Sequence, residues 1–285
     1  MAILSTQDQS VKQLKGLHLY HTDFCDCCDL VRITLAQKHL EWVSHYLDVI
    51  QGDHLSVDFF SLNPQGLVPV LVHNGIVINE SQDIVRYLDQ RFPDRSLVLM
   101  TLRHEQRLWT AAAAKVRQYI GVLCFEFLIK AFPFHRMNYA ARTKLHQQQG
   151  RTPGFYLDLG SRARVDYDDI GAALQAVNRA LQRLEQTLQD RPYLVGQYFS
   201  SADIAWLVQV HRLKILKLED LEQYPQVVSW YNTLQAHPAV QQGMVAWESK
   251  LLYDRFEGYI AQREKSGNGI NARIWRGQGA TLLAS

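Results

Sequence analysis

The sequence has few cysteines, no long apolar run and almost no net charge, and each shortage excludes a class of protein. Its four cysteines, three of them within four positions, do not form the disulfide framework of a small secreted protein. No apolar run reaches the roughly 20 residues that a membrane-spanning helix needs. A net charge of +2 gives no broad positive field for nucleic acid or a membrane surface. We therefore expect a cytoplasmic protein with no nucleic-acid partner and no membrane span.

What is present is the composition of an ordinary globular protein. Hydrophobic residues make up 47% of the chain and charged residues 20%, and its 285 residues suffice for two domains with their own cores. Residues 1–16 lack the apolar core of a signal peptide, and we interpret them as a flexible extension. The apolar pattern then changes along the chain, which predicts a first domain over 17–93 and a helical domain over 101–285.

The first domain alternates short apolar runs with helical segments. The pattern predicts strands at 17–20, about 43–48, 68–72 and 76–78, and helices at about 26–39 and 81–91. Asn74-Gly75 lies between the last two strands and is the strongest short signal for a hairpin. This order of elements predicts an α/β fold for the first domain.

The second domain is helical throughout. Apolar residues four and three apart form one stripe of a long helix at Ile170, Leu174, Val177, Leu181, Leu184 and Leu188. Ser200 and Asp203 have the spacing of a capping box, which predicts a helix start with a folding role. We interpret residues 131–168 as an insert with one short helix, whose basic side chains either attract an acidic substrate or form a solvated surface.

A cysteine cluster follows the first predicted strand and begins the first predicted helix. The unpaired N–H groups and the dipole of a helix start favour an anion there, and this setting lowers the pKa of a thiol. Cys25 and Cys28 have the Cys-x-x-Cys spacing of dithiol redox sites. Asp26 and Asp29 place negative charge at the same helix start, which opposes thiolate formation.

Pro69 stands at the start of a predicted strand, where a proline cannot donate to the sheet. A cis bond after Val68 explains this position, because it turns the Val68 backbone out of the sheet. The exposed N–H and C=O groups of Val68 are then a template for an extended peptide, such as the thiol peptide glutathione. We interpret Asn63 and Gln65 as turn formers rather than ligands.

Together these motifs give the chain a resemblance to the cytosolic glutathione transferases over roughly residues 17–245. The motifs that carry it are Leu67-Val68-Pro69-Val70-Leu71, Asn79-Glu80-Ser81, Tyr87-Leu88-Asp89 and Ser200-Ser201-Ala202-Asp203-Ile204. The resemblance implies a thioredoxin-like α/β domain followed by an all-helical domain. It also implies glutathione as co-substrate, and we expect a homodimer.

The class within the family follows from the residue at the catalytic position. That position lies seven residues before the arginine of the first helix, and counting back from Arg32 gives Cys25. The chain is therefore similar to the cysteine-type classes, which include omega-like enzymes and reductive dehalogenases. The segment at 52–55 is similar to the theta class, and the segment at 210–216 resembles plant tetrachlorohydroquinone-dehalogenase-like and ganglioside-induced-differentiation-associated proteins.

The resemblance also implies a glutathione site. Val68 and Pro69 hold the peptide backbone, Glu80 pairs with the ammonium of the γ-glutamyl group, and Ser81 and the helix start bind its carboxylate. His54 stands where theta-like enzymes contact the glycine end. The structural alternatives are that Ser81 only caps its helix and that His54 is a surface residue.

The other cysteines have alternative roles. Cys28 is either a thiol that resolves a mixed disulfide or a core residue, and Cys27 is a rival nucleophile. Cys124 lies in an apolar segment and is expected in the core. A metal site that combines the cluster with His21 lacks the second pair of ligands of usual zinc sites, so we expect no metal.

These observations predict a glutathione-dependent transferase that acts on a small electrophilic or disulfide substrate, with a role in detoxification. A cysteine favours thiol–disulfide exchange, reductive deglutathionylation or dehalogenation, because a thiolate can form a mixed disulfide. The alternatives are a glutathione-binding regulatory module without turnover, and ordinary conjugation of glutathione to electrophiles.

Overall fold

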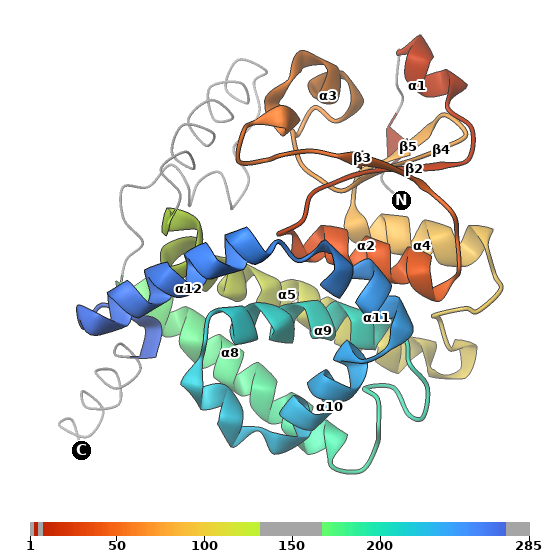
Figure 1. Cartoon of the computed structure of the whole chain (residues 1–285). Helices are drawn as coiled ribbons and strands as arrows, with labels where there is room; N and C mark the ends of the chain where they lie inside the picture. Colours follow the sequence, from red (N-terminus) through yellow and green to blue (C-terminus); the bar gives the residue numbers. More distant parts are fainter. Residues whose placement is uncertain (1–2, 5–7, 132–166, 272–285) are drawn as a thin grey trace. The chain divides into compact units, whose positions relative to one another are not determined.

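The computed structural model describes residues 3–4, 8–131 and 167–271 (Figure 1). These residues divide into two units. The first unit contains residues 3–4, 8–100 and 235–248, and the second contains 101–131, 167–234 and 249–271. The expected insert at 131–168 lies almost wholly outside the described residues. No helix among the described residues is long and apolar enough to cross a membrane.

The first unit is built on a mixed sheet with the strand order β1-β5-β4-β2-β3. Its strands are β1 (Ile3–Leu4), β2 (Leu17–His21), β3 (Val43–Tyr46), β4 (Val70–His73) and β5 (Ile76–Ile78). Strand β2 runs parallel to β3 and antiparallel to β4, while β5 pairs antiparallel with both β4 and β1. The predicted hairpin is confirmed, because Asn74 and Gly75 join β4 to β5 with φ angles of 51° and 79°.

Helices cover both faces of this sheet (Figure 1). They are α1 (Gln9–Gln13), α2 (Asp26–Gln37), the 3-10 helix η1 (Asp53–Leu55), α3 (Val57–Leu62) and α4 (Ser81–Arg91). Side chains alternate along β4, so Leu71 packs with α2 and α4 while Val70 and Val72 pack with α1 and α3. This is the thioredoxin-like arrangement that the sequence predicted.

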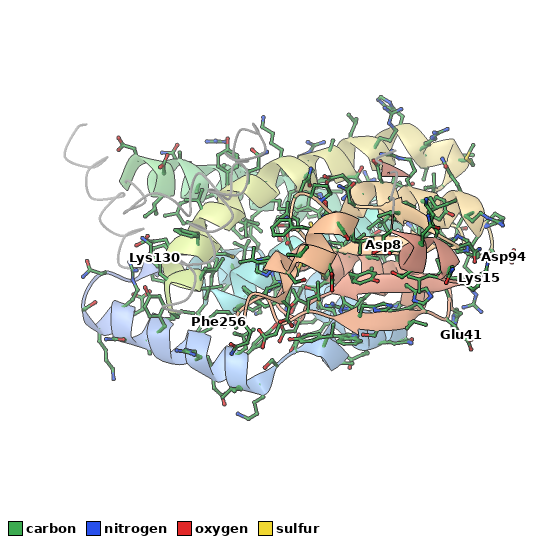
Figure 2. The ribbon with its side chains drawn as sticks, turned by 90° about the horizontal axis from the view of Figure 1, so that it is seen from above. Asp8, Lys15, Glu41, Asp94, Lys130 and Phe256 are labelled. Atoms are coloured by element: carbon green, nitrogen blue, oxygen red, sulfur yellow. The ribbon has the colours of Figure 1, made fainter. Side chains whose placement is uncertain are left out.

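The segment expected as a flexible extension contains ordered elements. Strand β1 pairs with β5. Asp8, labelled in Figure 2, caps α1 by accepting the Ser10 N–H at 2.8 Å. Val11 is only 6% exposed and belongs to the apolar cluster on the α1 and α3 face. Burial of a single valine in a five-residue helix leaves too short a pattern to recognise from sequence.

The second unit is all-helical, as predicted. Its helices are α5 (Arg103–Phe127), α8 (Tyr167–Leu188), α9 (Ser201–Ile215), α10 (Pro225–Gln235) and α12 (Lys250–Lys265), with the short 3-10 helices η3 (Ile129–Ala131) and η4 (Glu219–Gln223); η2 (Met100–Leu102) lies at the boundary. The expected capping box is confirmed at the start of α9, where the Ser200 N–H donates to Asp203 at 3.0 Å. Asp203 also accepts the Leu194 N–H at 2.8 Å, so this cap joins α9 to the preceding loop.

One segment of the expected helical domain belongs instead to the first unit. Helix α11 (Pro238–Gly243) and the 3-10 helix η5 (Val245–Trp247) fall within it, and α11 packs on α2. The approach is close, because a Cβ on Gly243 would lie 2.4 Å from the backbone nitrogen of Ile33. The glycine therefore allows two helix backbones to meet without a side chain between them.

Candidate functional site

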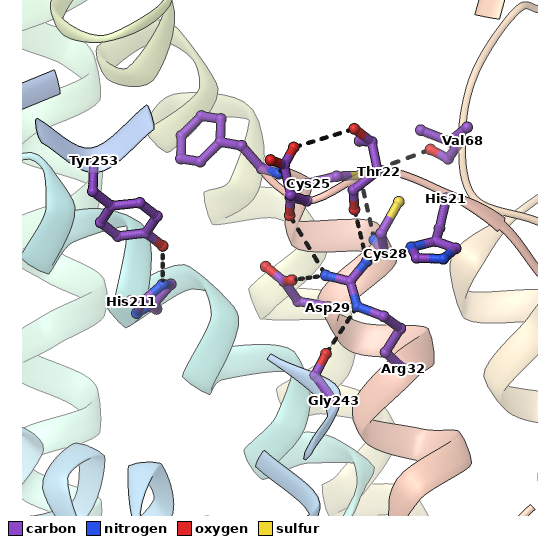
Figure 3. Close-up of polar contacts among 12 residues, drawn as sticks. His21, Thr22, Cys25, Cys28, Asp29, Arg32, Val68, His211, Gly243 and Tyr253 are labelled. Atoms are coloured by element: carbon purple, nitrogen blue, oxygen red, sulfur yellow. Dashed lines mark hydrogen bonds and ion pairs between the residues drawn. The ribbon is translucent and has the colours of Figure 1, made fainter. Parts of the chain in front are cut away.

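Cys25 is the N-cap of α2, at the end of the turn that leaves β2 (Figure 3). Its backbone is extended, and its Sγ accepts the Cys28 N–H at 3.3 Å. The thiol also faces the Val68 carbonyl at 3.9 Å. The fold thus brings the expected nucleophile to the backbone of the loop expected to hold glutathione.

The bond between Val68 and Pro69 is cis, as the sequence predicted. Pro69 is buried directly before β4, and Val68 is half-buried. Asn63 supports this loop, because its side-chain amide donates to the Leu67 carbonyl at 2.7 Å and its Oδ1 accepts the Gln65 N–H at 3.2 Å. Asn63 therefore forms the turn, as expected, and holds the chain just before Val68.

The electrostatics of Cys25 differ from the sequence-based expectation. Hydrogen bonding to the Cys28 side chain, burial, and the charges of Asp26 and Asp29 raise the pKa of the Cys25 thiol well above its ordinary value. The expected lowering by the helix start is therefore wrong for the free protein. The single N–H contact at 3.3 Å is outweighed by the hydrogen bond to the Cys28 side chain, by burial and by the two carboxylates at the same helix start.

The other cysteines lie in different surroundings. Cys28 is fully buried, whereas Cys27 is half-buried and accepts a hydrogen bond from the Ser81 hydroxyl at 3.3 Å. Cys124 is buried in α5, as expected for a core residue. All four cysteines are free thiols, and the described part of the chain holds no cluster of side chains suited to a metal ion.

Helix α4 begins with the two residues expected to hold the γ-glutamyl group. Glu80, not Ser81, is its N-cap, and Ser81 is its first residue. The expectation that Ser81 caps the helix is therefore wrong, because its hydroxyl contacts Cys27 instead. Glu80 is exposed and Ser81 is 9% exposed. Ser81 thus lies beside the cysteine turn, at a helix start where N–H groups can bind a carboxylate.

His54 lies in η1 and is buried, so it is not the surface residue of the structural alternative. Its carbonyl lies next to the loop before Val68, because a Cβ on Gly66 would come within 3.4 Å of it. The sequence did not identify Arg32 as part of the site. Its guanidinium binds the backbone of the turn that carries Cys25. In the sequence, Arg32 served only as the reference point from which the catalytic position was counted.

Comparison with known proteins decides the family. The glutathione S-transferase N-terminal domain matches residues 19–96, and the glutathione S-transferase C-terminal domain matches residues 135–238. The chain belongs to the glutathione S-transferase family. Glutathione is the co-substrate of this family, and the fold, with its thioredoxin-like and helical parts, agrees with the assignment.

Several members of the family are similar over most of their length. The chain is 26% identical to glutathione S-transferase TCHQD of Arabidopsis thaliana, covering 72% of this chain and 79% of the relative. It is 27% identical to protein LigF of Sphingobium sp., covering 73% and 85%. The crystal structure of beta-etherase LigF from strain SYK-6 superposes with a TM-score of 0.69 at 26% identity, over 80% of this chain and 98% of LigF.

A more identical match is shorter. Glutathione S-transferase 1 of Dianthus caryophyllus is 37% identical over 103 residues, which is 36% of this chain and about half, 47%, of that relative. The long alignments therefore support the family for both parts of the chain, while this higher identity is confined to one part.

Proposed function

We propose that this glutathione S-transferase uses Cys25 as the nucleophile of glutathione-dependent thiol–disulfide exchange. The observation that carries the proposal is the position of Cys25 Sγ, 3.3 Å from a helix-start N–H and 3.9 Å from the Val68 carbonyl. A peptide held along Val68 delivers its own sulfur next to that thiol. Glu80 and Ser81 bind the γ-glutamyl group, and His54 lies toward the glycine end.

The reaction proceeds in two exchanges. The Cys25 thiolate attacks the glutathione sulfur of a mixed disulfide between glutathione and a substrate thiol. The S–S bond breaks, and the substrate thiol leaves after taking up a proton. A second glutathione thiolate then attacks the Cys25 mixed disulfide, which releases oxidised glutathione and returns the Cys25 thiolate. We favour this one-thiol route over a Cys25–Cys28 dithiol, because Cys28 is fully buried.

Ordinary conjugation of glutathione is the second candidate, and the raised pKa of Cys25 favours it. A neutral thiol can donate a hydrogen bond to the glutathione thiolate without forming a covalent bond. The variant Cys25→Ser distinguishes the two candidates. A hydroxyl can replace the thiol as hydrogen-bond donor to glutathione, but it cannot form a mixed disulfide. Loss of exchange with retained glutathione binding supports exchange, whereas retained turnover of an electrophile supports conjugation.

The other cysteines provide the controls. Cys27→Ser should retain exchange activity, and Cys28→Ser should remain active if one thiol suffices. Full exchange in Cys25→Ser together with its loss in Cys27→Ser would move the nucleophile two residues along the turn. Loss in Cys28→Ser alone would replace the one-thiol route by a dithiol.

The acceptor is best found with a panel of small substrates. Disulfides, dehydroascorbate, aryl-glutathione thioethers and chlorinated quinols test the reductive reactions, and a β-ether tests the activity for which LigF is named. We place the protein in the cytoplasm as a homodimer. Sedimentation at micromolar concentration measures the dimer, and cell fractionation measures the location. If the protein binds glutathione, contains no metal and turns over none of these substrates, the result would support the alternative of a glutathione-binding regulatory module.

A further inference from the structure

Arg32 is a fully buried cation whose donors converge on the turn before Cys25 (Figure 3). Nη1 donates to the Thr22 carbonyl at 2.6 Å and to His21 Nδ1 at 2.9 Å. Nη2 pairs with the Asp29 carboxylate and lies 3.5 Å from the Asp23 carbonyl. The guanidinium thus binds two successive carbonyls of the turn, those of Thr22 and Asp23, which lie three and two residues before Cys25.

The fifth guanidinium donor faces a segment that lies 211 residues further along the chain. Arg32 Nε donates to the Gly243 carbonyl at 2.9 Å, at the end of α11. The ring of Trp247 then lies over the guanidinium, with its centroid 5.1 Å from Cζ. Since a guanidinium is held best when its planar fork and its face are both contacted, α11 and η5 fix the orientation of Arg32.

The same cation fixes the state of His21. An arginine can only donate, so His21 Nδ1 must accept, and its proton sits on Nε2, which donates to the Ser44 hydroxyl at 2.8 Å. Burial, and then the charge of Arg32, lower the pKa of His21 to about 3. His21 is therefore a neutral support of the turn and is no base for the thiol at physiological pH.

We infer that Arg32 is a positioning residue for Cys25 and that Gly243 and Trp247 clamp it. The inference rests on the proposed role of Cys25. Arg32 aligns the Thr22 and Asp23 carbonyls and pairs with Asp29, which partly offsets the negative charge that opposes the Cys25 thiolate. The reactivity of the thiol in the N-terminal part of the chain therefore depends on a short segment near residue 245.

Trp247→Ala tests the clamp without deleting the buried charge. Trp247 is half-buried, and a cavity of about 320 Å³ bordered by Arg32, Trp42 and Trp247 opens beside it, so water can replace the ring. We expect a fall of about tenfold or more in kcat for disulfide exchange, because a small misplacement of a reacting atom is costly. The KM for glutathione should stay within about twofold, since its binding groups are elsewhere. Trp247→Phe keeps a ring over the cation and should restore kcat.

Trp42→Ala is the matched control. It removes an equally large ring at the same cavity, and Trp42 packs on His21 and Trp247 rather than over the guanidinium. It should lower the melting temperature and lower kcat by much less than Trp247→Ala does, because it leaves the Trp247 ring over the guanidinium. Arg32→Lys keeps the charge without the fork and should lower kcat without moving the pH–rate profile. Arg32→Gln frees the Asp29 charge and should move that profile to higher pH.

The outcomes separate this inference from the proposed function. Wild-type kcat in Trp247→Ala, with exchange abolished in Cys25→Ser, overturns the clamp and leaves the nucleophile in place. Equal losses of kcat in Trp247→Ala and Trp42→Ala show general loosening and also overturn it. Exchange retained in Cys25→Ser removes both proposals.

Discussion

Gly243→Ala should be strongly destabilising, although alanine is normally the better helix residue. At an open helical position this exchange stabilises by about 0.5–1 kcal/mol. At Gly243 the new Cβ would lie 2.4 Å from Ile33 N, 2.5 Å from Ile33 Cα and 2.6 Å from Arg32 C. All three atoms are backbone of α2, so no flexible side chain can move away, and α11 itself must shift.

The magnitude follows from two costs. Overpacking of this kind costs about 1–3 kcal/mol. A shift of α11 also weakens the 2.9 Å hydrogen bond from Arg32 to the Gly243 carbonyl, and bonds to charged groups contribute about 1.5–3 kcal/mol. After subtracting the gain in helix propensity, we expect a loss of about 2–4 kcal/mol in the free energy of unfolding.

Urea unfolding followed by tryptophan fluorescence measures this loss. Gly171→Ala in α8 and Gly258→Ala in α12 are matched controls, because nothing lies within 4 Å of a Cβ at either position. They should be neutral or slightly stabilising. If Gly243→Ala unfolds at the same urea concentration as these controls, the close approach of α11 to α2 does not exist in solution.

Three further predictions concern the proposed site and the second unit. Ser81→Ala should weaken glutathione binding by about 1–3 kcal/mol in calorimetry; unchanged affinity in both Ser81→Ala and Glu80→Ala would remove the site from α4. The rate at which iodoacetamide alkylates Cys25, measured by mass spectrometry, should still rise with pH above about 8.5, the ordinary pKa of a thiol, because the pKa of Cys25 is raised. A rate that reaches its plateau below that pH would contradict the assigned burial and charges. Ser200→Ala should cost about 0.5–2 kcal/mol of stability, measured by calorimetric unfolding, and leave glutathione affinity intact; lost catalysis at an unchanged melting temperature would mean that Ser200 acts in the reaction.

The sequence predicted the elements whose signals are local. The Asn74-Gly75 turn, the start of α2 at the cysteines and the capping box of α9 each depend on residues within a few positions of one another. Such patterns fix backbone geometry directly, because turn and cap residues satisfy nearby N–H and C=O groups. The roles expected for Cys25 and Val68 came only through the resemblance to the family.

Long-range contacts account for what the sequence missed. The packing of α11 on α2 joins residues about 210 positions apart and depends on a missing side chain, which leaves no apolar pattern. The pKa of Cys25 depends on burial as well as on the helix start, and burial is a property of the packed unit. Ser81 carried a capping signal, yet its hydroxyl contacts Cys27, 54 residues earlier.

Strand β1 has a practical consequence for fragments of this protein. A fragment that begins at residue 17, where sequence patterns place the first domain, loses the strand that pairs with β5 and the helix that covers Val70, Val72 and Val77. An unpaired strand edge beside an uncovered apolar face is a template for intermolecular pairing. Such a fragment should therefore aggregate, whereas one that keeps residues 3–16 retains its own edge protection.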